Sequence, residues 1–148
     1  MRILALDIGD KRIGVALSDP MGILATPLTI LECRDAEQAV AAITRIIDQN
    51  RVEMIIAGLP LSMNGSIGLQ AAKVKTFVEM LSHRTQVPIE FRDESLTTVE
   101  ARRIMLTSRS KKDRQRSRDD AVAAAVILQG YLEECRIKTR PKEEVNDA

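Results

Sequence analysis

The sequence is poor in several residue types on which common functional sites depend. Its 148 residues include one histidine, one tyrosine, two phenylalanines and no tryptophan. A single histidine excludes histidine-rich zinc sites and HExxH metalloprotease helices, and so few rings cannot stack a run of successive bases. The two cysteines, Cys33 and Cys135, form no CxxC pair, and no apolar run is long enough to span a membrane. We therefore expect a cytoplasmic protein with reduced thiols and no membrane partner.

The sequence does contain enough apolar residues for the core of one domain, since 45% of them are hydrophobic. Apolar runs predict five strands, over residues 2–8, 13–18, 23–31, 52–57 and 87–91. Pro27 favours an edge position for the third strand, because proline cannot donate to a ladder. Capping residues and helical spacing predict four helices, which begin near Asp35, Ser66, Thr97 and Arg118.

This order of elements predicts an α/β fold. We expect a mixed five-stranded sheet, with a three-stranded antiparallel start followed by parallel strands, and helices on both faces. Residues 1–137 should form a single domain, and residues 138–148 a polar, disordered tail.

The formal net charge is only +1, which taken alone argues against a nucleic-acid partner. That total conceals an uneven distribution. Residues 109–118 (RSKKDRQRSR) carry a net charge of +5, and the remaining chain, with 16 basic and 20 acidic residues, carries −4. A flexible basic arm at about residues 107–118 is either a solvated loop or a phosphate-binding segment that gains affinity by counterion release. Its basic residues are Arg109, Lys111, Lys112, Arg114, Arg116 and Arg118.

Three carboxylates stand at the ends of elements that should be buried. Asp7 lies near the end of the first strand, Glu94 with its neighbour Asp93 follows the fifth, and Asp120 with its neighbour Asp119 opens the last helix. Three carboxylates that meet in a partly dry cleft repel one another unless a cation neutralises them. Oxygen-only ligands suit Mg²⁺ or Mn²⁺, and such ions can activate water for attack on a phosphodiester.

Each of these positions also has a purely structural explanation. Asp7 could cap the turn at Gly9, the acids before Thr97 could belong to a solvated loop, and those before the last helix could favour its dipole. Lys11 and Arg12 either reach phosphates near Asp7 or simply form a polar turn. Residues 58–65, which include Gly58 and Asn64, leave a strand end where α/β sheets place ligand loops, but they also have ordinary turn chemistry.

Four blocks of sequence together resemble the YqgF (RuvX-like) family of Holliday-junction-resolvase-like or pre-16S-rRNA nucleases. They are residues 7–19 (DIGDKRIGVALSD), 58–68 (GLPLSMNGSIG), 93–101 (DESLTTVEA) and 120–132 (DAVAAAVILQGYL). The resemblance implies a ribonuclease-H-like fold and metal-dependent endonuclease chemistry on structured nucleic acid. It also implies a role in trimming the 5′ end of pre-16S rRNA.

Matched position by position, the resemblance assigns metal binding and catalysis to Asp7, Glu94 and Asp120, with Mg²⁺ or Mn²⁺ as cofactor. Ser95 stands where family members commonly carry arginine. If that arginine holds a phosphate, Arg92 or the basic arm must replace it in this chain.

Several functions remain open at this point. The first is an endonuclease acting on structured RNA or on branched DNA, where a two-fold junction would require a homodimer. The second is a non-catalytic RNA-binding factor of the same fold. The third is nucleotide binding of the actin and sugar-kinase type, although those proteins place ATP between two lobes and this chain has the length of one.

Overall fold

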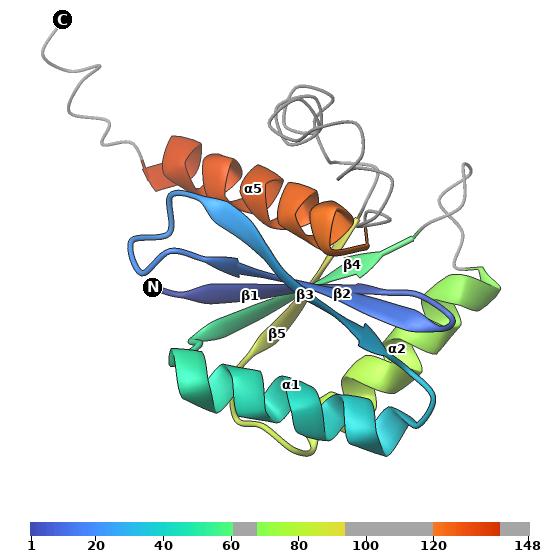
Figure 1. Cartoon of the computed structure of the whole chain (residues 1–148). Helices are drawn as coiled ribbons and strands as arrows, with labels where there is room; N and C mark the ends of the chain where they lie inside the picture. The colour runs from blue at the N-terminus through green and yellow to red at the C-terminus, as the bar shows by residue number, and fades with distance from the viewer. Residues whose placement is uncertain (61–67, 94–119, 140–148) are drawn as a thin grey trace, which may run out of the picture.

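A five-stranded mixed sheet with helices on both faces forms the fold (Figure 1). The computed structural model describes residues 1–60, 68–93 and 120–139, with the side chains of the last helix described over residues 121–136. The strand order is β3-β2-β1-β4-β5. The strands are β1 (Ile3–Ile8), β2 (Arg12–Ser18), β3 (Ala25–Glu32), β4 (Met54–Leu59) and β5 (Ile89–Asp93). The helices are α1 (Ala36–Asn50), α2 (Leu69–Ser82) and α5 (Asp120–Thr139).

Strand β1 occupies the middle of the sheet because both of its faces are apolar. It pairs antiparallel with β2 and parallel with β4, which in turn pairs parallel with β5. Successive side chains of a strand point to opposite faces. Leu4 and Leu6 accordingly belong to the core under α1 and α2, whereas Ile3 and Ala5 belong to the core under α5.

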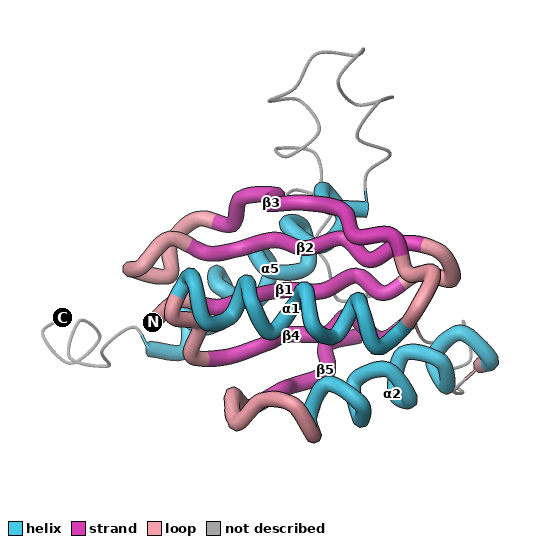
Figure 2. The backbone as a smooth tube through the Cα atoms, turned by 60° about the horizontal axis from the view of Figure 1, so that its bottom comes forward, coloured by secondary structure: helices cyan, strands magenta, loops and turns pink. Residues whose placement is uncertain are grey.

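The helices divide between the two faces in a way that separates the two cores. Figure 2 shows α1 and α2 together on one face, and α5 on the other. The core under α5 contains many alanines, whose small side chains let a helix lie close to the sheet. They come from the strands and from the helix alike: Ala5, Ala16, Ala25, Ala124 and Ala125. None of the helices within the described residues is long and apolar enough to cross a membrane.

The predicted fold class is confirmed, and several details of the prediction hold. Strand β3 lies at the edge of the sheet and contains Pro27, as expected. Asp35 caps α1, with its side chain accepting a hydrogen bond from the Glu37 N–H at 3.0 Å. The helix predicted from Thr97 lies outside the described residues. Helix α5 continues to Thr139, two residues past the predicted end of the domain.

Some predicted boundaries are wrong, because apolar residues can be buried without joining a strand. β4 begins at Met54 rather than at Val52, whose N–H bonds the carbonyl of Ile47 in the connection from α1. β3 begins at Ala25, because the preceding residues form a turn. β5 is likewise shifted, to Ile89–Asp93, whereas α5 is described from Asp120 onward, so its predicted start near Arg118 lies outside the described residues. Ser66 is not the cap of α2, since that position belongs to Gly68 in an extended conformation.

Candidate active site

The carboxyl ends of three parallel strands meet at one edge of the sheet. Leu6 of β1 lies opposite Ala57 of β4, which lies opposite Phe91 of β5. Asp7 therefore comes one residue after this row on β1, and Asp93 two residues after it on β5. The two strands are separated only by β4, so their backbones lie about 10 Å apart. This edge is where an α/β sheet commonly places a ligand.

Asp7 lies on the face of the sheet that α5 covers. The alternation along β1 places it with Ile3 and Ala5, which pack under α5, and it lies opposite Gly14 of β2. The residue is half-buried. Gly14 therefore places no side chain across the strand pair from this carboxylate.

Helix α5 runs antiparallel to β1, so its first residue reaches the same edge. Gln129 accepts a hydrogen bond from the Ala25 N–H at 2.9 Å, at the end of the sheet where β1 begins. From Gln129 back to Asp120 the helix rises about 13.5 Å. From Ile3 to Asp7 the strand extends about 13 Å. The backbone of Asp120 thus lies at the level of Asp7. Figure 1 shows α5 running along the sheet in the direction opposite to β1.

The structure brings three predicted pieces of chain to one edge but does not describe all three carboxylates. Glu94 lies outside the described residues and follows Asp93 directly, and of Asp120 only the backbone is described. Among the side chains that the structure describes, no three potential metal ligands cluster. Of the three predicted metal ligands, Asp7 is therefore the one whose carboxylate the structure describes.

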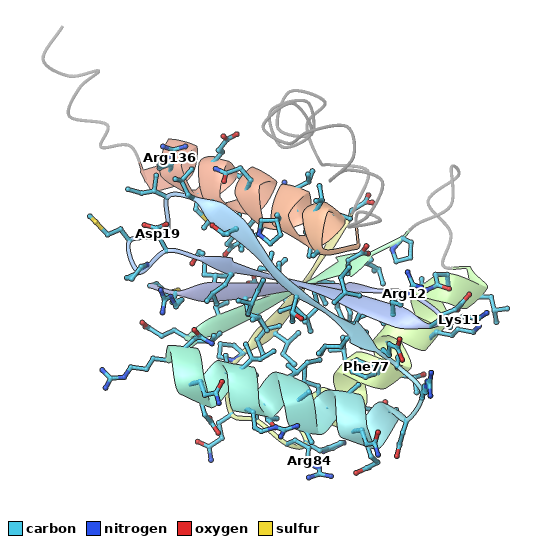
Figure 3. All side chains as sticks on the ribbon, viewed as in Figure 1. Lys11, Arg12, Asp19, Phe77, Arg84 and Arg136 are labelled. Carbon is cyan, nitrogen blue, oxygen red and sulfur yellow. The ribbon has the colours of Figure 1, made fainter. Side chains whose placement is uncertain are left out.

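The turn after Asp7 is tight and carries two exposed basic residues. The Gly9 N–H donates to the carbonyl of Arg12 at 2.8 Å. A Cβ at Gly9 would lie 3.0 Å from that same oxygen, so a larger residue would strain the turn. Lys11 and Arg12 are exposed and line a hollow of about 300 Å³ together with Arg34. Figure 3 shows Lys11 and Arg12 at the same end of the molecule as Phe77.

Arg92 does not serve as an exposed replacement for the arginine missing at position 95. Its side chain is only 9% exposed and bonds the Glu134 carboxylate of α5 at 2.6 Å. Gly130 makes room for it, because a Cβ there would lie 3.3 Å from Nη2 of the guanidinium. The arginine thus ties β5 to α5. The sequence analysis did not predict this pair. The one sign of it in the sequence was Gly130, a single glycine within an apolar helix, which can mark a close approach by another group.

The other predicted site residues are only partly described. Gly58 is buried inside β4, opposite Arg92, and Asp93 is the half-buried last residue of β5. The remaining ones lie outside the described residues, namely Asn64, Asp119 and the six basic residues of the arm: Arg109, Lys111, Lys112, Arg114, Arg116 and Arg118.

Comparison with known proteins adds a consistent set of relatives. A family model described as RuvX, Holliday junction resolvase, matches residues 1–134. A protein of Roseiflexus sp. (strain RS-1) named "Putative pre-16S rRNA nuclease" is 46% identical over 135 residues, which cover 91% of this chain and 96% of the relative. A protein of the same name from Dehalococcoides mccartyi is 50% identical over 127 residues, covering 86% and 94%.

Solved structures share the fold at low sequence identity. RuvC of T. thermophilus, determined in complex with a Holliday junction substrate, superposes with a TM-score of 0.67 at 11% identity, covering 94% of this chain and 97% of that one. The Fowlpox virus resolvase superposes with a TM-score of 0.55 at 14% identity, covering 91% and 99%. The likeness to RuvC confirms the predicted ribonuclease-H-like fold.

Proposed function

The chain belongs to the RuvX family of Holliday junction resolvases, and from this premise we propose that it is a metal-dependent endonuclease acting on structured nucleic acid. Its activity is hydrolysis of phosphodiester bonds. The observation that carries the proposal is the meeting of three chain segments at one sheet edge. These segments are the end of β1 with Asp7, the end of β5 before Glu94 and the start of α5 at Asp120.

The residues at this edge fit a hard divalent cation. Asp7 offers a half-buried carboxylate beside Gly14, and the other two predicted ligands, Glu94 and Asp120, are also carboxylates. An all-oxygen donor set of this kind suits Mg²⁺ or Mn²⁺ rather than zinc. Bound there, such an ion would supply activation of a water molecule and stabilisation of the leaving oxygen. Asp7, Glu94 and Asp120 would hold the cation through their carboxylates.

Basic residues beside the edge supply the grip on the nucleic-acid backbone. Lys11 and Arg12 project from the turn that follows Asp7 (Figure 3). The arm at 109–118 adds a net charge of +5 directly before Asp120 in the sequence. Cations near the carboxylates would attract phosphates to a site that would otherwise repel them.

The substrate that we favour is pre-16S rRNA, because the relatives at 46% and 50% identity are named for it, with its 5′ end as the site that the family resemblance implies. This role belongs in the cytoplasm and needs one copy of the chain. Cleavage of a four-way DNA junction is the alternative, and its two-fold symmetry would require a homodimer.

A cleavage assay with Mn²⁺ tests the proposal, with a precursor-rRNA 5′ end and a four-way DNA junction as parallel substrates. We expect metal-dependent cleavage that is lost in Asp7→Asn, Glu94→Gln and Asp120→Asn. Asp48→Asn, at an exposed position of α1, is the control and should cleave like the wild type.

The outcome also separates an enzyme from a non-catalytic RNA-binding factor. A factor would bind the RNA equally well with and without metal, would cut neither substrate, and would keep its cellular role in the carboxylate variants. Size-exclusion chromatography with light scattering, with and without the junction, would detect the dimer that resolvase activity requires.

A further inference from the structure

A hollow beneath the turn after Asp7 is not used by the chemistry proposed above. It has a volume of about 440 Å³ and lies between this turn, the start of α1 and one side of α2. We call it the turn pocket. Two contacts fix α2 against the turn: Gln70 Nε2 donates to the carbonyl of Ile8 at 3.1 Å, and Lys73 Nζ lies 3.0 Å from the Asp10 carboxylate. The turn pocket therefore lies at the same end of β1 as Asp7 but on the opposite face of the sheet, because Asp7 faces α5 whereas the pocket faces α1 and α2.

The walls of the turn pocket are mainly apolar, with polar groups at one side. Phe77 and Met80 of α2 and Ala36 of α1 line it. Leu69, which also lines it, is 79% exposed and adds apolar surface at its rim. The volume and the lining match sites that take a small, largely apolar group held by a few polar contacts.

The surroundings of the turn pocket are basic although the body of the protein is acidic. A second hollow, of about 300 Å³, adjoins it through Cys33, which lines both. Around the two hollows stand two carboxylates, Asp10 and Glu32, and four cations, Lys11, Arg12, Arg34 and Lys73. Gly68, the N-cap of α2, makes no side-chain capping hydrogen bond. An apolar slot beside cations complements a nucleotide better than it complements an apolar peptide.

We propose that the turn pocket binds an unpaired nucleobase of the substrate strand while Lys11 and Arg12 hold the adjoining phosphates. Asp10, which lines the turn pocket, follows Asp7 by three residues, so their Cα atoms lie at most about 11 Å apart, and a strand that crosses the turn could reach both. At about 3.4 Å per stacked nucleotide, that distance spans at most three nucleotides. The inference rests on the proposed function and sharpens its substrate: a strand with an unpaired base next to the cut, which a fully paired four-way junction lacks.

Fluorescence anisotropy in EDTA tests the binding without cleavage. The probes are a labelled RNA hairpin with a short single-stranded 5′ flank and the same hairpin with a blunt end. The full-length chain should bind the flanked hairpin about fivefold or more tightly, the gain expected from docking one base. Ala72→Leu, which fills the pocket from α2, should remove most of that gain and leave blunt-hairpin affinity unchanged.

A matched control is Ala41→Leu, on the side of α1 away from its buried residues Ile43 and Ile47. Ala41→Leu should still bind the flanked hairpin more tightly than the blunt one. Thermal melts of both variants check that the fold is intact. Equal affinity for the two hairpins, or equal losses in Ala72→Leu and Ala41→Leu, would overturn the proposal. If the chain binds the flanked hairpin more tightly but cuts nothing with Mn²⁺, the nuclease proposal is refuted and base binding in the turn pocket is supported. If it cuts RNA but binds both hairpins equally, the nuclease proposal is supported and base binding in the pocket is refuted.

Discussion

The contact between Arg92 of β5 and Glu134 of α5 offers a quantitative test of how the helix is held on the sheet. The arginine side chain is 9% exposed and that of the glutamate 44%. Removing one partner of a fully buried ion pair costs about 3–5 kcal/mol, whereas breaking an exposed pair costs at most about 1 kcal/mol. Because water already reaches the glutamate, we expect Glu134→Ala to lower the free energy of unfolding by about 2 kcal/mol.

For a chain of this length, about 2 kcal/mol corresponds to a fall in Tm of roughly 6 °C. Thermal melts followed by far-ultraviolet circular dichroism would measure it. Glu133→Ala is a closely matched control, because Glu133 is 41% exposed and lies 4.0 Å from Arg136, which is itself 57% exposed. It should change the free energy of unfolding by no more than about 0.5 kcal/mol.

A sharper prediction concerns the stability of a variant in which both Arg92 and Glu134 are replaced. Among the described residues, Nε of Arg92 is buried without a hydrogen-bond partner. Arg92→Met removes both this unsatisfied donor and the buried charge, and keeps apolar contact beneath α5. The double variant Arg92→Met/Glu134→Ala should therefore be more stable than Glu134→Ala alone. Equal destabilisation by Glu134→Ala and Glu133→Ala, or strictly additive effects of the two changes, would refute the reasoning.

Three further predictions follow from local contacts. Gly130→Ala should lower Tm, although alanine usually stabilises a helix by about 1 kcal/mol, because its Cβ would press on the buried arginine; a raised Tm would contradict this. Backbone N–H groups of Leu24, Ile23 and Met21 lower the pKa of Asp19 below 3.8. Asp19→Asn should therefore reduce Tm at neutral pH, with the difference from wild type vanishing as the pH falls through the lowered pKa. Burial, with the neighbouring Cys135, raises the pKa of Tyr131; phenolate absorbance of this single tyrosine should develop only at a higher pH than in the urea-unfolded chain.

Much of the fold is readable from local pattern. An apolar run such as residues 3–8 is stable only when covered on both faces, so it predicts a central strand. Asp35 predicts the start of α1 because its carboxylate can accept a backbone N–H there. Strand boundaries were less predictable: Val52 is buried in the core as part of a connection, and burial alone does not distinguish the two cases.

The residues of the candidate site could also be predicted from the sequence, whereas their arrangement in space could not. Asp7, Glu94 and Asp120 could be selected from the sequence, because each acid adjoins a predicted strand or helix end and matches a family block. The chain segments that carry or directly precede these acids meet at one edge because β1, β4 and β5 are parallel and α5 runs back along β1. No local pattern contains that information, because strand order and helix direction are determined by which faces can be buried together.

By itself the sequence determined the elements, the acids at their ends and the basic arm, since these depend on residues near one another in the chain. Only the tertiary structure decided that Arg92 is a buried anchor rather than a phosphate contact, because its partner, Glu134, lies 42 residues away. The same holds for the turn pocket, whose walls come from the β1–β2 turn, the start of α1 and the side of α2. Ion pairs and cavities of this kind arise between elements, where packing rather than local propensity selects the neighbours.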